Sequence, residues 1–136
     1  MNVRAPTWIL VAIISLMFCC SNVNEQKEVE ALAFRVHEQM RAGDFASIYR
    51  DSETRFKTVG TESEFVRSLK GFQEQLGNFK HAETVGYEIK FDSRGKTHEL
   101  HCELEYEHGR AREDLTIVRS ATGQMQLWSL EIQPLD

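Results

Sequence analysis

The sequence predicts an α+β domain in which three N-terminal helices pack on a curved four-stranded antiparallel sheet. Three observations support this fold class. Apolar residues recur at helical spacing as far as Leu76, they alternate with polar residues from Asn78 onward, and glycines separate the alternating segments. Helices followed by strands, with little mixing of the two, are typical of α+β layers in which the helices cover one face of the sheet.

The first helix is expected over residues 25–42, where one apolar stripe recurs every three or four residues. Gly43 ends this helix, because glycine readily adopts the left-handed conformation found after a helical C-terminus. Asp44 then caps a short second helix, since its side chain can accept a hydrogen bond from the first turn. The stripe of the first helix consists of Val29, Leu32, Ala33, Val36 and Met40, and the second helix carries Phe45, Ile48 and Tyr49.

The third helix begins at a capping box, in which Thr61 and Glu64 can satisfy each other's backbone N–H groups. It ends at Gly77, after which the apolar period becomes two. Four strands follow, and their turns contain glycine. The expected strands are residues 79–91, 97–108, 110–120 and 124–132, with turn glycines Gly95, Gly109 and Gly123.

A two-residue turn at residues 108–109 sets the expected register between the second and third strands. It places Glu107 opposite Arg110 and Glu105 opposite Arg112, so that two opposite-charge pairs fall on one face. The other face is then apolar, which means that charge and hydrophobicity favour the same pairing.

An apolar run at residues 8–18 follows Arg4 and precedes Cys19 and Cys20, which is the pattern of a secretory signal. The run is much shorter than the ~20 residues that a transmembrane helix needs. Because a cysteine stands where cleavage is expected, the segment resembles a bacterial lipoprotein signal, in which an acylated (palmitate-type) cysteine begins the mature chain. Cys20 follows a smaller residue than Cys19 and is the preferred site, with simple secretion as the alternative. The expected domain plan is a signal peptide at 1–19, a short tether at 20–26 and one domain at 27–136.

The charge balance limits the classes of partner. The chain has 16 Lys and Arg against 21 Asp and Glu, a net charge of −5, so it lacks the basic surface that nucleic-acid binding requires. Membrane attachment is therefore expected through the lipid anchor, with the exported domain facing the periplasm. Ser21, rather than an aspartate, follows Cys20, which favours the outer membrane. No cofactor is expected.

Structural motifs lie at residues 41–45 (RAGDF), at the helix end Leu76-Gly77, and in the closing strands at 115–118 (LTIV) and 128–130 (WSL). Through them, residues 29–134 resemble the nuclear transport factor two-like superfamily, which has a cystatin-like cone fold, and in particular its small exported bacterial members of unknown function. The superfamily includes isomerases, dehydratases, polyketide cyclases and non-enzymatic modules, so the resemblance implies a fold without choosing a function.

Strong catalytic and nucleotide-binding motifs do not occur in the sequence. His98 and His101 lie three residues apart on a predicted strand, so they point to opposite faces and cannot share a metal ion. One strand face carries a row of acidic residues without the closed ligand geometry of a zinc site. We expect a solvated acidic strip and no metal site along this row, which consists of Glu99, His101, Glu103, Glu105 and Glu107.

Glu113 is the candidate functional side chain. The expected register places it on the apolar face, across from Leu104 and beside Leu115, where a carboxylate is costly unless it is paired. Tyr106 from the same face and Tyr49 from the second helix would complete a polar pocket inside the cone. The alternative is that Glu113 lies near the open end of its strand and is hydrated.

Val118, Met125 and Leu127 are expected to form an apolar patch on the outer face of the last two strands. A contiguous apolar patch often marks an interface, so this one predicts a homodimer formed through the sheet. The leading functional hypothesis is a non-enzymatic, membrane-tethered periplasmic module that binds a protein partner or a small ligand. The alternative is a small cofactor-independent isomerase, lyase or cyclase that uses Glu113 as its general base.

Overall fold

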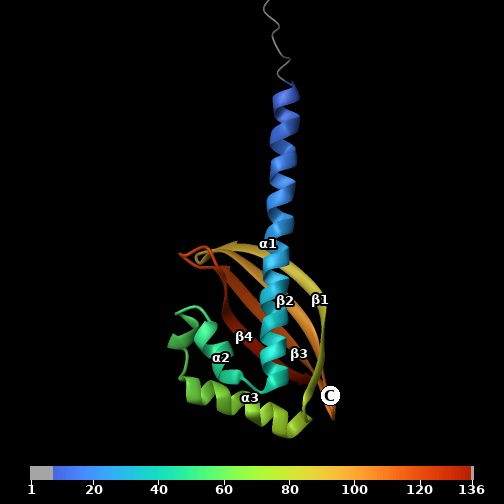
Figure 1. Cartoon of the computed structure of the whole chain (residues 1–136), viewed down its shortest axis with the longest axis vertical. Coiled ribbons are helices and arrows are strands. Elements are labelled where there is room, and N and C mark those ends of the chain that lie inside the picture. Colours follow the sequence, from blue (N-terminus) through green and yellow to red (C-terminus); the bar gives the residue numbers. More distant parts are fainter. Residues whose placement is uncertain (1–7, 136) are drawn as a thin grey trace, which may run out of the picture.

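The computed structural model describes the backbone of residues 8–135 and the side chains of residues 23–135. All four strands are antiparallel, and they follow one another in the sheet in chain order. The curved sheet lies against the long first helix, and the shorter helices lie near the lower end of that helix (Figure 1). The predicted α+β cone fold is therefore confirmed. The elements are α1 (Trp8–Ala42), α2 (Phe45–Asp51), the 3-10 helix η1 (Phe56–Thr58), α3 (Glu62–Leu76), β1 (Phe79–Asp92), β2 (Gly95–Tyr106), β3 (Gly109–Arg119) and β4 (Met125–Leu135).

The helix α1 begins well before the predicted start at residue 25 and runs through the predicted tether at 20–26. Its predicted apolar stripe is confirmed, because all five residues of the stripe are buried. Gly43, at a φ of 69°, ends the helix as expected. The side chains of Cys19 and Cys20 lie outside the described residues, so the lipid anchor stays a prediction. Within the described part of the chain, no helix combines the length and the apolar character needed to cross a membrane.

Both predicted N-caps are present. Asp44 accepts a hydrogen bond from the backbone N–H of Ser47 at 3.4 Å. In the capping box, the hydroxyl of Thr61 accepts from the N–H of Glu64 at 3.3 Å, and the Glu64 carboxylate accepts from the N–H of Thr61 at 2.8 Å. These local hydrogen bonds fix where α2 and α3 begin.

The pairing of β2 with β3 differs from the predicted register by two positions. Glu105 lies opposite Arg110 and Glu103 opposite Arg112, so the turn falls at residues 107–108 and not at 108–109. Because side chains alternate with a period of two, this shift leaves the residues of both strands on their predicted faces.

Contacts with the end of α3 explain the position of this turn. The backbone N–H groups of Glu107 and His108 donate to the carbonyls of Asn78 and Leu76, at 3.1 and 2.8 Å. Gly77 passes so close to the turn that a β-carbon there would lie 2.7 Å from that of Glu107. The alternation within the strands does not reveal these long-range contacts.

A bulge interrupts the pairing of β3 with β4 at Trp128. Thr116 lies opposite Ser129, whereas the next residue, Ile117, lies opposite Leu127, which leaves Trp128 without a partner on β3. An extra residue in one strand reverses the alternation of side chains beyond it. The part of β4 that precedes Trp128 therefore presents the opposite face from the one that the sequence predicts.

This reversal makes the predicted outer patch wrong. Met125 and Leu127 are part of the hydrophobic core, and Leu127 is only 2% exposed. Val118 lies opposite the fully buried Thr97 and is itself buried. Because these three side chains are buried, they do not form the exposed patch on which the prediction of a homodimer depended.

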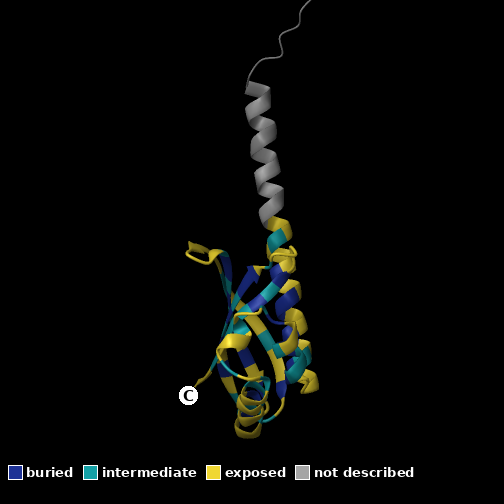
Figure 2. Cartoon of the chain, turned by 90° about the vertical axis from the view of Figure 1, so that its left-hand side faces the viewer, coloured by how far each residue is buried: buried dark blue, intermediate teal, exposed yellow. Residues whose placement is uncertain are grey.

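The core lies between α1 and the concave face of the sheet, where buried residues gather in Figure 2. Val29 and Val36 from the helix, and Leu100, Leu115 and Ile117 from the central strands, are almost completely buried. Each fully buried aliphatic side chain of this size contributes roughly 1.5–3 kcal/mol. This packing therefore holds the part of α1 from Val29 to Met40 on the sheet.

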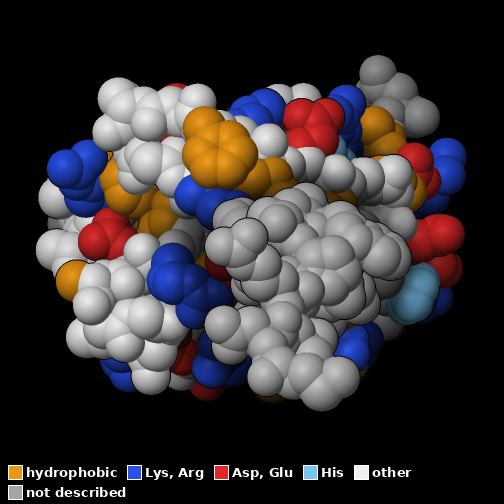
Figure 3. All heavy atoms as spheres, turned by 90° about the horizontal axis from the view of Figure 1, so that it is seen from above, with side chains coloured by type: hydrophobic (Ala, Val, Ile, Leu, Met, Phe, Trp, Pro, Cys, Tyr) orange, Lys and Arg blue, Asp and Glu red, His pale blue; other side chains and the backbone are white. Residues whose placement is uncertain are grey.

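A charged cluster joins α1 to one end of the sheet. Glu25 forms an ion pair with Lys96, and its carboxylate lies 3.8 Å from Arg119 and 3.9 Å from His98. The hydrogen bond from Lys96 lowers the pKa of Glu25. Figure 3, which views this end of the molecule, shows Lys, Arg, Asp and Glu side chains interspersed across it. Glu25, expected within the tether, is thus docked on the domain.

Candidate functional site

Glu113 lies on the concave face of β3, directly opposite Cys102 of β2, and has no exposed surface. Its predicted place on the apolar face is confirmed, but the predicted partner across the strands is wrong, because the shifted register puts Cys102 and not Leu104 opposite Glu113. The alternative, that water reaches it at the open end of the strand, is wrong, because α1 covers this part of the sheet. A carboxylate in such a position requires a polar partner.

The partner is His37 of α1, whose Nε2 atom lies 2.6 Å from Oε2 of Glu113. The His37 ring is itself buried and stacks on Phe79 of β1, with the ring centroids 5.9 Å apart. The sequence analysis missed this pair. A signal exists, however: His37 lies within the apolar stripe of α1, just as Glu113 lies within the apolar face of β3.

The second carboxylate oxygen of Glu113, Oε1, is buried and has no hydrogen-bond partner among the described residues. Two further polar groups lie in the same interior. Burial, together with the nearby charge of Glu113, raises the pKa of the Cys102 thiol to about 12. The same two causes raise the pKa of Tyr106 above its ordinary value. Both groups therefore stay protonated at neutral pH.

Tyr106 borders a small cavity that neither Glu113 nor Cys102 lines. The cavity has a volume of about 10 Å³ and is lined by Met40, Phe45, Leu69, Gln73, Phe79 and Tyr106. This volume is at the lower limit for a single water molecule. Tyr49 does not contribute to it, so the predicted pocket of Glu113, Tyr106 and Tyr49 is not formed. Glu113 itself has no exposed surface, so a substrate cannot reach its carboxylate in this arrangement.

A much larger open groove, with a volume of about 420 Å³, lies between α2, η1, α3 and β4. Its walls are mainly aromatic and aliphatic, with a few polar side chains. Arg50 of α2 holds Glu62 of α3 through two hydrogen bonds, at 3.1 and 2.7 Å, which helps to fix the helical side. The lining residues are Tyr49, Phe56, Val59, Gly60, Thr61, Glu64, Phe65, Ser68, Trp128, Ser129, Leu130 and Glu131.

Three aromatic rings from three elements pack together on the helical side of the groove. Tyr49, Phe56 and Phe65 have ring centroids 5.3 to 6.0 Å apart. The Tyr49 hydroxyl donates to the carbonyl of Gly60 at 2.8 Å, which ties the loop after η1 to α2. Tyr49 thus supports an aromatic wall of this groove and lies outside the polar pocket in which the sequence analysis placed it.

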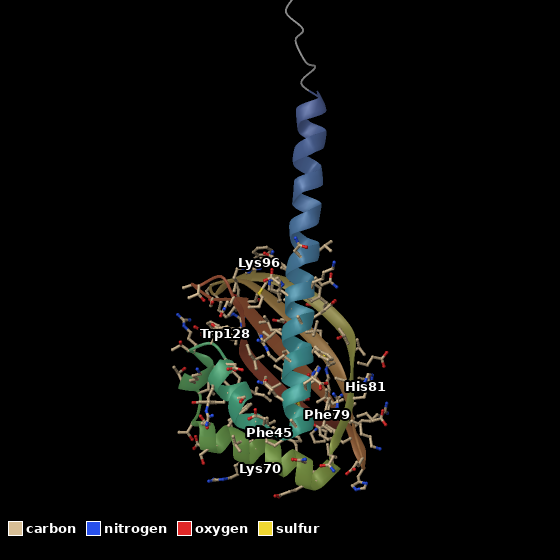
Figure 4. The ribbon with its side chains drawn as sticks, in the orientation of Figure 1. Phe45, Lys70, Phe79, His81, Lys96 and Trp128 are labelled. Carbon is tan, nitrogen blue, oxygen red and sulfur yellow. The ribbon has the colours of Figure 1, made fainter. Side chains whose placement is uncertain are left out.

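Trp128 is the aromatic residue on the opposite side, and the bulge at its own position sets its direction. Figure 4 shows its side chain on β4, next to the segment that follows α2. The guanidinium of Arg55 lies 5.2 Å from the centre of its ring, a cation–π contact that holds the indole. The backbone N–H of Glu53 donates to the carbonyl of Leu127 at 2.9 Å and fastens the same segment to β4.

The polar side chains of the groove are acidic or neutral. Hydrogen bonds from Thr61 lower the pKa of Glu64, which keeps this carboxylate ionised. Glu131 is exposed on β4, and no lysine or arginine belongs to the described lining. The charged side chains of the lining itself are therefore carboxylates, and the Arg55 guanidinium is a cation in contact with the lining residue Trp128.

The outer face of β2 carries the predicted acidic strip, and basic residues pair with part of it. Glu99 binds Lys90, and Glu103 lies 3.7 Å from Arg110. His101 bonds Asp114, while His98 is buried on the other face, as the strand spacing predicts. The strip is part of the polar surface of the sheet.

No protein-family model matches the sequence, and no curated protein matches it. Several solved structures share its fold, including the two that follow. A protein of Catenulispora acidiphila has a TM-score of 0.60 at 14% identity, over 84% of this chain and 94% of that one. ActVI-ORFA of Streptomyces coelicolor has a TM-score of 0.57 at 14% identity, over 82% of this chain and 96% of that one. At such low identity these likenesses show the fold alone.

Proposed function

We propose that this chain is an exported, membrane-tethered binding module that holds a small aromatic ligand in the groove between η1, α3 and β4. The observation that carries the proposal is the lining of this groove, where Trp128 and the cluster of Tyr49, Phe56 and Phe65 border one open volume. Rigid aromatic walls of this kind favour the stacking of a planar ring.

The size and charge of the groove narrow the class of ligand. Its volume of about 420 Å³ lies within the roughly 300–1,000 Å³ of small-molecule sites. The carboxylates of Glu64 and Glu131 repel anions and attract cations, and the hydroxyls of Ser68 and Ser129 offer hydrogen bonds. The expected ligand is a neutral or cationic compound with one or two aromatic rings.

The membrane tether is supported by the N-terminal sequence. The apolar run at residues 8–18 and the cysteine pair precede the domain by only a few residues. Glu25 is held on the sheet by Lys96, so little free chain would separate an acylated Cys20 from the domain. Such a domain would work close to the membrane surface.

The geometry does not favour the alternative of carboxylate catalysis. Glu113 has no exposed surface, and its Oε2 atom is engaged by His37. A general base must come within hydrogen-bond reach of the proton that it removes. The open groove is therefore the better candidate for ligand contact.

Tryptophan fluorescence tests the proposal directly, because Trp8 and Trp128 are the two tryptophans of the chain. In the full chain with Trp8→Phe, held in lipid nanodiscs, Trp128 becomes the only source of indole emission. Titration with benzylamine, a soluble cationic aromatic compound whose own absorption and emission do not overlap those of indole, is expected to change that emission until it saturates. A change that stays proportional to the added compound, or no change, would refute binding at the groove.

A further inference from the structure

We infer that His37, Cys102 and Glu113 form a binding site for a divalent transition metal ion, with zinc as the best match to the three donor atoms. A nitrogen of His37, the Sγ atom of Cys102 and a carboxylate oxygen of Glu113 all lie within 4.8 Å of one another. All three residues are buried. The inference does not depend on the groove or on its ligand.

Three different elements of the fold bring these donors together. Cys102 and Glu113 face each other across β2 and β3 and point to the same concave side. His37 approaches from α1, and its ring is held by stacking on Phe79. Donors on packed helices and strands, as here, are positioned more rigidly than donors on loops.

The unpartnered oxygen of Glu113 independently points to a missing ligand. Oε1 is fully buried and has no hydrogen-bond partner among the described residues. Buried polar atoms without partners are rare, because desolvation is not repaid by a new interaction. A bound cation would satisfy this oxygen and would also use the Cys102 sulfur, whose contact with the Thr84 hydroxyl is long at 3.9 Å.

The donor set fits zinc. Histidine nitrogen, cysteine sulfur and carboxylate oxygen are its usual ligands, and three protein ligands leave one position for water. Binding would displace the proton of the Cys102 thiol, which the pKa of about 12 keeps in place in the metal-free protein. A second proton would leave if His37 enters as imidazolium. If His37 enters neutral with its proton on Nε2, that proton would move to Nδ1.

Another group of metal-ligating residues on the sheet does not support the same inference. Glu88, Glu99 and His101 also bring donor atoms within 4.8 Å, but they are exposed or half-buried. Lys90 pairs with both carboxylates, and His101 bonds Asp114. Each of the three residues already has a polar partner, so this group serves as the internal control.

Cobalt titration of the full chain tests the inference. The chain carries Cys19→Ser and Cys20→Ser, so that Cys102 is its only thiol. It is stripped with a chelator and refolded with Co²⁺, which allows a buried site to fill. We expect one Co²⁺ per chain and a near-ultraviolet charge-transfer band from thiolate to cobalt. We also expect that Zn²⁺ abolishes the band.

Two matched variants assign the site. Cys102→Ser should abolish the charge-transfer band and weaken Zn²⁺ binding roughly tenfold or more. His101→Gln should change neither property. Circular dichroism verifies that each variant is folded. A folded parent without the band after refolding with Co²⁺, or equal Zn²⁺ affinity in the parent and in Cys102→Ser, would overturn the inference.

Discussion

The Nε2 atom of His37 lies 2.6 Å from Oε2 of Glu113, although the two residues are 76 positions apart in the sequence. The pair links α1 to the centre of the sheet inside a mainly apolar core. Burying a charged or strongly polar group is costly unless the partner group is present. The domain should therefore be less stable when only one of the two residues is present than when both are present or both are replaced.

We expect His37→Leu to lower the free energy of unfolding by about 3–5 kcal/mol, because it leaves the Glu113 carboxylate buried without a partner. The double variant with Glu113→Leu should recover much of this loss. Denaturant unfolding in the presence of a chelator measures both effects. A single variant that costs less than about 1 kcal/mol would show that the pair is not buried as described.

Leu127 supplies a test of the β4 bulge. Because the bulge turns this residue into the core, Leu127→Ala should lower the free energy of unfolding by about 2–5 kcal/mol. Leu135→Ala, at an exposed position of the same strand, should change it by less than about 0.5 kcal/mol. Equal effects of the two substitutions would mean that β4 follows the simple alternation, with Leu127 on the outer face.

His98 should make stability depend on pH. Burial lowers the pKa of His98 below the ordinary histidine value of 6.5. Between the two values the unfolded chain binds a proton that the folded domain does not, so stability falls as the pH drops below about 6.5 and levels off below the folded-state pKa. Unfolding measured between about pH 8 and pH 5 should show this fall, and His98→Gln should reduce it.

The neighbours of His98 provide a control for this pH dependence. The Glu25 carboxylate favours the charged imidazolium, whereas Lys96 and Arg119 oppose it. Glu25→Gln should therefore lower the pKa of His98 further and enlarge the loss of stability on acidification. A pH profile that is the same in the parent and in His98→Gln would contradict the assignment.

The lipid anchor has a test of its own. If Cys19 or Cys20 is acylated, the membrane-extracted protein should begin at that cysteine, and its intact mass should include acyl chains. Combining Cys19→Ser with Cys20→Ser should then prevent processing at the cysteine. A soluble mature form that begins elsewhere, and that the two substitutions leave unchanged, would instead indicate simple secretion.

The local features of the fold could be predicted from the sequence because neighbouring residues determine them. The capping box of Thr61 and Glu64 and the stop at Gly43 depend on a few adjacent positions. The β2–β3 register was wrong by two positions, because the end of α3 holds the turn at residues 107–108. The faces predicted for these two strands are nevertheless correct, because a register shift of two positions leaves each side chain on the same face of the sheet.

Features that depend on tertiary contacts could not be predicted in the same way. The bulge at Trp128 interrupts the alternation of side chains, and no glycine or proline stands at this position to indicate a bulge. Met125 and Leu127 therefore lie on the opposite face of the sheet from the predicted one. The partnership of His37 with Glu113 appears only when α1 is laid on the sheet. The position of Glu113 on the apolar face could be predicted, because a carboxylate within an alternating apolar pattern is exceptional.

The most direct test of the proposed function is calorimetric titration of the full chain in nanodiscs with 2-naphthylmethylamine. Val59 lines the groove and is 90% exposed, so Val59→Arg should add an opposing charge with little effect on folding. The exposed Val85 of β1 lies outside the groove lining and gives the matched control, Val85→Arg. We predict one binding site per chain, clearly weaker in Val59→Arg and unchanged in Val85→Arg. Equal binding by both variants, or no binding by the parent chain, would contradict the assignment of the groove as the ligand site.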